Sequence, residues 1–391
     1  MTPVPLDLPL RPRETAELAN IVFLLAERKP LNDDVRGRVA SRLVAVQFES
    51  LRPYPLSLDR DPVHHSTFYM AVDGQNAEPL LLHMSPAAAP TSAIFPKPLL
   101  IGRMRQPNGP EIILNAIPFG PSNQQNIERF ASQIDGAFLP RAQASRPALM
   151  AGSTPATFEA FRRIFKSSRK NVAALEAQAG EAPRSFYYAA IWAAIRAGWR
   201  EGYTSGFTLT VNRDIDTLRD TISEAAPLTR FVVDVSALVG TPVDAEPPAF
   251  DTSPFPAEEL RALAAKYAAA IKAAERAHEL IRQARAAQKI TRPFDFEFSL
   301  EHASEPTAAK ELAFCLGWLK ARGHAAHLAA PRIDRGSDLD GLAAAARFEQ
   351  CALTVDAERV DVAAIVRATA GSINLRVKSG DIVETAAELF G

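Results

Sequence analysis

The sequence predicts an α/β protein: a TIM-like (β/α)8 barrel with a smaller N-terminal α+β region. The main observation is that four short apolar strands alternate with three helices between Pro293 and Asp381. This alternation is typical of parallel β/α units, in which each helix crosses back over the sheet. Similar segments extend upstream to about residue 126 and bring the count to about eight strands. We therefore expect an α+β region over residues 1–125 and a barrel over residues 126–391.

The N-terminal region combines amphipathic helices with a proline-rich stretch of short strands. After an extended arm, apolar residues recur at helical spacing over residues 13–28 and 32–48. Two later apolar runs, residues 99–104 and 111–115, flank an Asn-Gly pair. Because Asn-Gly readily adopts positive φ angles, this pattern predicts a β-hairpin.

Strands and helices alternate along the barrel region as well. The segments expected as strands, the first of them as a strand or a turn, are 136–139, 148–152, 206–211 and 231–238. The segments expected as helices before residue 290 are 155–166, 184–202, 214–225 and 256–288. The last of these is rich in alanine and carries its charges on one face, as a helix on the outside of a barrel does.

The composition argues against several classes of partner and cofactor. The chain has 44 basic and 45 acidic residues and no basic stripe, so we expect no nucleic-acid partner. Neither a P-loop nor a G-x-G-x-x-G motif is present, so we expect no nucleotide cofactor. The apolar runs are too short to span a membrane, and the N-terminus lacks a signal-peptide pattern. We expect a cytoplasmic protein without membrane attachment, and two inert core cysteines, Cys315 and Cys351.

Polar residues follow several of the expected strands at their carboxyl ends, where a barrel of this type carries its chemistry. Asp234 and Glu301 are the candidate catalytic carboxylates there. The alternative for Asp234 is that it caps the next turn through Ser236. Arg332 follows a strand end and is a candidate for binding a substrate carboxylate through two parallel hydrogen bonds. The alternative for Arg332 is a salt bridge with Asp334 or Glu301.

The segment 295–299 differs from the other strands because acidic and apolar residues alternate along it. A period of two puts Asp295, Glu297 and Ser299 on one face, and the phenylalanines at 294, 296 and 298 on the other. We expect the polar face to line the barrel interior. The phenylalanines are then expected to pack against the surrounding helices.

Glu297 is the most unusual carboxylate on this polar face. A buried carboxylate is costly unless a cation or a proton accompanies it. Glu297 is therefore a candidate catalytic residue or metal ligand, and the alternative is an ion pair with Arg332 or Arg376. His327 on the next expected strand is the candidate second ligand, or else a histidine packed in the core. A divalent metal of unspecified identity is the cofactor that such a pair would bind.

The last expected strand is followed by Lys378, Ser379, Gly380 and Asp381. Backbone amides at the start of a helix can bind an anion, and Lys378 would add positive charge. Lys378, Ser379 and Asp381 are therefore candidate substrate-binding residues. The alternative is a simple helix N-cap made by the Ser-Gly-Asp sequence.

Four phrases between Trp192 and Asp381 resemble, in the same order, phrases of the tagaturonate/fructuronate epimerase family. They are FVVDVS at 231–236, FEFSLE at 296–301 with PT at 306–307, LAAPR at 328–332, and LRVKSGD at 375–381. The resemblance covers about half of the chain. It implies a metal-dependent barrel enzyme that epimerises a hexuronate, which is a small-molecule sugar acid.

Several polar positions of the family pattern are replaced in this chain. The family's acid-and-histidine stretch falls on Ser205–Thr210, which reads SGFTLT, and its strand-end histidine falls on Lys378. A divalent site needs several carboxylate or imidazole ligands that converge. The resemblance therefore implies a divergent sugar-acid epimerase or isomerase with reduced or lost catalysis. Two alternatives remain: a non-catalytic relative that binds a sugar acid or a partner protein, and an unrelated barrel sugar isomerase or lyase.

Overall fold

The computed structural model divides the chain into two compact units. The described residues are 4–7, 17–18, 20–21, 31–46, 51–61, 66–73, 79–87, 95, 99–105, 108–119, 121–134, 136–143, 148–152, 172–177, 180–248, 255–369 and 373–376. Unit 1 comprises Met1–Leu139 and Ile191–Glu201, and unit 2 comprises Pro140–Ala190 and Gly202–Gly391. The sequence analysis placed its single division between residues 125 and 126.

Unit 1 is built on an antiparallel six-stranded sheet in the order β1-β5-β6-β4-β3-β2. The strands are β1 (Val4–Asp7), β2 (Leu51–Asp61), β3 (Ser66–Asp73), β4 (Pro79–Pro86), β5 (Leu99–Arg105) and β6 (Glu111–Pro118). Strands β5 and β6 pair as the hairpin that the sequence predicts, and Asn108 between them has a φ angle of 58°. This prediction is confirmed.

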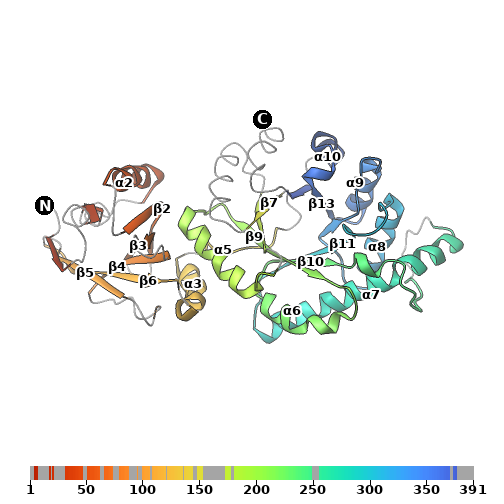
Figure 1. The fold of residues 1–391 in the computed structure, drawn as a ribbon, viewed down its shortest axis with the longest axis horizontal. Helices are drawn as coiled ribbons and strands as arrows, with labels where there is room; N and C mark the ends of the chain where they lie inside the picture. Colours follow the sequence, from red (N-terminus) through yellow and green to blue (C-terminus); the bar gives the residue numbers. More distant parts are fainter. Residues whose placement is uncertain are drawn as a thin grey trace. The chain divides into compact units, whose positions relative to one another are not determined.

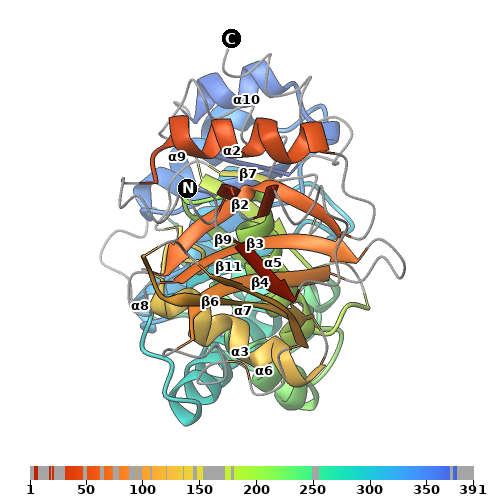
Figure 2. The same cartoon turned by 90° about the vertical axis from the view of Figure 1, so that its left-hand side faces the viewer.

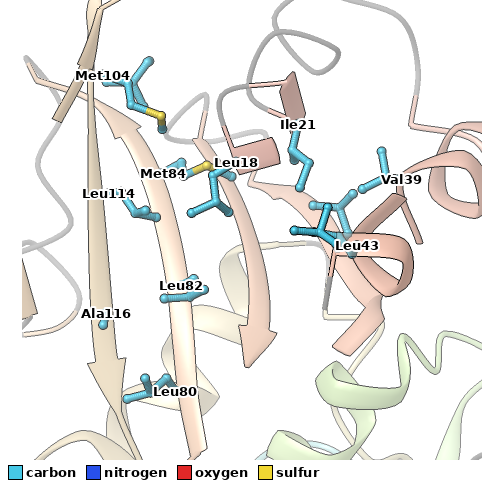
Figure 3. Close-up of a cluster of buried hydrophobic side chains, with 13 residues drawn as sticks. Leu18, Ile21, Val39, Leu43, Leu80, Leu82, Met84, Met104, Leu114 and Ala116 are labelled. Atoms are coloured by element: carbon cyan, nitrogen blue, oxygen red, sulfur yellow. The ribbon is translucent and has the colours of Figure 1, made fainter. Parts of the chain in front are cut away.

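Helix α2 (Asp33–Val46) contacts the edge strand β2 in unit 1, which also contains α3 (Pro121–Gln133) (Figures 1 and 2). The core of the unit is apolar. Leu18 and Ile21, with Val39 and Leu43 of α2, form one cluster with buried side chains of β4, β5 and β6 (Figure 3). Of the two predicted N-terminal helices, the one at 32–48 is confirmed as α2.

Unit 2 is a closed barrel of eight parallel strands. They are β7 (Ala148–Gly152), β8 (Val172–Glu176), β9 (Tyr203–Thr210), β10 (Arg230–Asp234), β11 (Asp295–Ser299), β12 (Leu328–Ala330), β13 (Ala352–Asp356) and β14 (Ile373–Arg376). Each strand pairs with the next one along the chain, and β14 pairs with β7 to close the ring. The predicted parallel arrangement of the barrel strands is therefore confirmed.

Helices follow six of these strands within the described residues. They are α5 (Pro183–Ala197), α6 (Arg219–Ala225), α7 (Ala257–Ala287), α8 (Ala309–Ala321), α9 (Leu339–Phe348) and α10 (Val362–Ala368). Figure 1 shows α6 to α10 around the outside of the strands. The helix expected at 155–166 and the segment after β14 lie outside the described residues. Residues 136–139 form a turn, and β8 is a strand that the sequence analysis did not place.

Strand β11 has the two faces that its alternating sequence predicts. Phe294 and Phe296 lie against His278 of α7, with ring centroids 5.7 and 4.9 Å from that of the histidine. On the other face, Glu297 forms an ion pair with Arg230 of β10 inside the barrel. The predicted orientation is therefore confirmed for these phenylalanines and for Glu297.

Asp295 belongs to a second polar group in the barrel interior. It accepts a hydrogen bond from the backbone N–H of Gln143, whose side-chain amide donates to Asn374 of β14. Asn374 in turn donates to the hydroxyl of Thr354 on β13 at 3.4 Å. All four residues are buried. Asp295 is thus satisfied by structural partners, as buried polar groups generally are.

Two further expectations concern the helices and the cysteines. Within the described ranges, no helix combines the length and the apolar character needed to cross a membrane.

Cys315 of α8 and Cys351, just before β13, are both buried and free. Burial raises the pKa of both thiols well above the ordinary value, which makes them poor nucleophiles.

His278 of α7 is a buried histidine on the outer side of the barrel. Its Nδ1 lies 3.0 Å from Nδ1 of His324, which follows α8. Burial lowers the pKa of His278 to about 4, and the neighbouring His324 and Arg282 act in the same direction. The imidazole is therefore neutral in the folded protein at neutral pH.

We predict that this histidine makes the folded protein less stable as the pH falls from 6.5 towards 4. In the unfolded chain His278 takes up a proton near its ordinary pKa of 6.5, and in the folded chain only near its lowered pKa of about 4. Protons therefore favour the unfolded state between these two pH values. Between about pH 7 and about pH 5, the free energy of unfolding measured in urea should fall by about 2 kcal/mol more in the wild type than in His278→Gln. The same pH dependence in both proteins would contradict this prediction.

Candidate active site

At the carboxyl end of β10, Asp234 binds both Ser236 and His302. Ser236 donates to one carboxylate oxygen of Asp234 from its backbone N–H at 3.1 Å and from its hydroxyl at 2.5 Å. Nδ1 of His302 lies 2.8 Å from the other carboxylate oxygen. The backbone N–H of His302 also donates to the Ser236 hydroxyl at 3.0 Å. The side chain of Asp234 is 6% exposed and that of His302 is 61% exposed, so a buried carboxylate orients an exposed imidazole.

This arrangement determines which nitrogen of His302 is available for chemistry. A carboxylate only accepts hydrogen bonds, so the bond to Asp234 places a hydrogen on Nδ1. In the neutral imidazole, Nε2 then carries the lone pair. A base that is held by a second group in this way is typical of general acid–base catalysis. The Ser236 hydroxyl donates to Asp234 and not to His302, so the serine is not activated as a nucleophile.

The sequence analysis predicted Asp234 at this site, whereas it interpreted His302, which also follows a strand end, as an exposed residue and gave it no role. The alternative considered for Asp234, a turn capped with Ser236, is present, and the catalytic role of this carboxylate stays a prediction. The signal for His302 is the pairing of β10 with β11. Strand β10 ends in Asp234 and β11 is followed by Leu-Glu-His, so the acid and the histidine come from adjacent strand ends.

Glu301 precedes His302 and lies among three arginines. Arg376 of β14 forms a salt bridge with one oxygen of its carboxylate, and Nη1 of Arg359 lies 4.0 Å from the other. Arg332 and Arg359 each donate from Nη1 to the backbone carbonyl of Glu301 at 3.3 Å. Glu301 is buried. This predicted catalytic carboxylate is therefore in an ion pair at the carboxyl end of the barrel.

Arg332 lies where the sequence predicts a substrate-binding arginine. Its salt-bridge alternatives were Asp334 and Glu301. Asp334 instead accepts hydrogen bonds from Gly336 and from Ser337. Arg332 reaches the carbonyl of Glu301 and has no carboxylate within salt-bridge distance among the described residues.

A layer of charged side chains lies inside the barrel. Arg376 donates to Glu176 of β8 at 3.2 Å, and Thr208 of β9 donates to the same carboxylate at 2.8 Å. Arg230 binds Glu297 through Nε at 2.8 Å and through Nη2. Burial would raise the pKa of Glu176, but Arg376 and Arg230 hold it below its ordinary value. Burial raises the pKa of Glu297 above its ordinary value, although Arg230 opposes the change.

Glu297 and Arg230 are both 0% exposed, so neither side chain reaches the surface where a ligand would bind. The sequence analysis considered Arg332 and Arg376 as the ion-pair partner of Glu297. That choice of partner was wrong, because the arginine that binds Glu297 is at the start of the neighbouring strand β10. Glu297 is therefore part of the barrel interior.

His327 does not meet Glu297 inside the barrel. It is exposed, and its Nδ1 accepts the backbone N–H of Phe296 at 3.1 Å. Leu328 is in register with Glu297, so His327 lies at the level of Phe296 and off the interior face. In the part of the chain that the structure describes, no three His, Cys, Asp or Glu residues could hold a metal ion. Those residues do not supply the ligand set that the resemblance implies.

The remaining candidates, Lys378, Ser379 and Asp381, follow β14 and lie outside the described residues. Their role in substrate binding stays a prediction. The nearest described residue is Arg376, whose two salt bridges place the end of β14 beside Glu176 and Glu301.

Comparison with known proteins adds one finding. No protein-family model matches the sequence, and no curated protein matches it significantly. Among solved structures, a glycerol complex of fructuronate-tagaturonate epimerase from Cohnella laeviribosi has a TM-score of 0.60 at 16% identity, covering 87% of this chain and 74% of that chain. The native structure of that epimerase has a TM-score of 0.60 at 16% identity, covering 90% of this chain and 76% of that chain. This chain has the fold of that epimerase. The resemblance is confirmed as a likeness of fold.

On this epimerase fold, the stretch Ser205–Thr210, where the family pattern has acids and a histidine, is most of strand β9. Its Thr208 hydroxyl donates to Glu176, and Ser205 is buried. The chain therefore has hydroxyl groups at this position. Its ionisable groups at the carboxyl end come from other strand ends, above all from His302 and the arginines around Glu301.

Loss of one member of the Arg230–Glu297 pair should destabilise unit 2 strongly. Glu297→Ala leaves a buried guanidinium without its carboxylate, which typically costs about 3–5 kcal/mol. Replacing both residues by apolar ones, Arg230→Met with Glu297→Leu, should recover much of the loss. Urea unfolding of the wild type and both variants measures these differences. A Glu297→Ala protein as stable as the wild type would show that the pair does not carry this role.

Proposed function

We propose that this protein is a divergent, hexuronate epimerase-like protein that binds a sugar acid at the carboxyl end of its barrel. The observation that carries the proposal is the exposed imidazole of His302 held by the buried carboxylate of Asp234. It lies at the end of the barrel where proteins of this architecture carry their chemistry. The fold likeness to fructuronate-tagaturonate epimerase supports a sugar acid as the class of ligand.

In this proposal, Nε2 of His302 removes a proton from a carbon next to the ligand's carbonyl. Asp234 stabilises the imidazolium that forms, and such positioned bases contribute about 10²–10⁴-fold to a rate. Negative charge develops on the carbonyl oxygen and needs a cation close by. Lys378, one of the predicted substrate-binding residues after β14, is proposed to supply that charge. A water molecule donates a proton to the other face of the carbon, the imidazolium of His302 releases its proton to solvent, and the product is the epimer at that carbon.

We further propose that turnover is slower than in an enzyme with the family's full set of polar residues. Glu297 and Glu301 are engaged with arginines, so neither is a ready base. A single side-chain cation also stabilises a developing oxyanion less than a Lewis-acid metal does. The divalent metal that the resemblance implies stays a prediction, as does the cytoplasmic location.

A second candidate function is a non-catalytic relative that binds a sugar acid. The observation in its favour is the same engagement of Glu297 and Glu301 in ion pairs. Both candidates require binding of a sugar acid at the same end of the barrel. They differ in whether a carbon–hydrogen bond of the ligand is broken.

Proton exchange distinguishes the two candidates with the greatest sensitivity. Tagaturonate or fructuronate is incubated with the protein in D2O, with and without added Mn²⁺, Zn²⁺ or Ni²⁺, and followed by NMR. We expect slow loss of the signal of the proton next to the carbonyl. In His302→Gln the rate should fall about 100-fold or more, because the base is removed. His327→Gln is the matched control, because that exposed histidine lies off the interior face of the barrel.

The possible results lead to different conclusions. Equal exchange in the wild type and His302→Gln would remove the histidine from the mechanism. Binding of the sugar acid without exchange would favour the non-catalytic candidate. A protein that neither binds the two sugar acids nor exchanges their protons would overturn the proposed function.

A further inference from the structure

Arg332 and Arg359 lie close together at the carboxyl end of the barrel. Each donates a hydrogen bond from Nη1 to the same atom, the backbone carbonyl oxygen of Glu301, at 3.3 Å. A carbonyl oxygen has two lone pairs and can accept both bonds. The acceptor is neutral, however, so it does not compensate the two positive charges. Two like charges at this separation repel each other unless an anion is near.

The carboxylates around these two arginines compensate them only in part. Oxygens of Asp356 and Glu301 lie 3.8 and 4.0 Å from nitrogens of Arg359, which is beyond hydrogen-bond distance. Arg332 has no carboxylate partner among the described residues. The side chain of Arg359 is 33% exposed, so a ligand can reach it.

Glu301 does not compensate the remaining positive charge of Arg332 and Arg359, because its carboxylate is bound to another arginine. One of its oxygens binds Arg376, which also binds Glu176. Burial alone would lower the pKa of Arg376, yet Glu176 and Glu301 hold it above the ordinary value, as expected for a tightly compensated cation. The second oxygen of Glu301 faces Arg359 without forming a hydrogen bond to it.

We propose that Arg332 and Arg359 form a binding site for an anionic group of the ligand, and that Glu301 is the internal carboxylate that competes with it. This inference rests on the proposed function for the identity of that group, the carboxylate of a sugar acid. A carboxylate accepts charge-assisted hydrogen bonds from two guanidinium groups at once. Glu301 directly precedes His302 in the chain, so we expect an anion bound here to hold the rest of the ligand near the exposed imidazole.

Binding measurements test the two roles separately. Isothermal titration with tagaturonate compares the wild type with Arg359→Gln, Glu301→Gln and Arg335→Gln. Arg335 is an exposed arginine in the loop after β12 and serves as the matched control. Arg359→Gln should weaken binding about tenfold or more, because it removes a charged donor. Glu301→Gln should tighten it severalfold, because it removes the competing charge. Tagatose, the uncharged counterpart, should show neither change.

A second experiment does not depend on the sugar acid. Phenylglyoxal modifies accessible arginines, and mass spectrometry of peptides gives the rate at Arg359. In Glu301→Gln we expect added sodium acetate to slow this modification, and in the wild type we expect a smaller effect. Arg335 should show no protection in either protein. Circular dichroism confirms that each variant is folded, and Arg359→Gln tests the site independently if Glu301→Gln is unstable.

Each result has a defined meaning. Unchanged tagaturonate affinity in Arg359→Gln, or weaker affinity in a folded Glu301→Gln, overturns the anion site. Absence of acetate protection at Arg359 in Glu301→Gln overturns it as well. Acetate protection without any tagaturonate binding supports the anion site and contradicts only the proposed sugar-acid function.

Discussion

The buried ion pair between Arg230 and Glu297 is the constraint on which the polar end of the barrel depends. Neither side chain reaches solvent, so each charge must be compensated inside the barrel. The pKa of Glu176 stays low despite its burial because of Arg376 and Arg230, which connects this pair to the end of β14. Arg376 then reaches Glu301 at the carboxyl end. Alternating charges therefore extend from the middle of the barrel to the surface that a ligand meets.

Glu301 and His302 are adjacent in the chain but have opposite surroundings. The first is buried among arginines, and the second is exposed and oriented by Asp234. The carbonyl of Glu301 accepts hydrogen bonds from two arginines, and the N–H of His302 donates to Ser236. The backbone of Glu301 and His302 after β11 is therefore held by arginines at its carbonyl group and by a serine at its N–H group. A single stretch of backbone thus sets the position of the cations relative to the imidazole.

Local sequence patterns predicted those features that depend on one segment alone. The alternation over residues 295–299 gave both faces of β11, and Asp234 was recognised at a strand end. Strand β8 was missed because its sequence, VAALE, has a single β-branched residue, and Glu176 was missed with it. The partners of Glu297 and Asp234 depend on the pairing of β10 with β11, which brings residues 67 and 68 positions apart into contact. No local pattern contains that information.

Helix α5 begins in unit 2 and ends in unit 1, because residues 191–201 belong to the first unit while the segments on either side belong to the second. The chain therefore crosses between the units three times. During synthesis, unit 1 lacks one of its segments until β7, β8 and the first half of α5 have been made. The two units are interleaved in the order of translation, so no single cut in the gene separates them into complete, independently expressed modules.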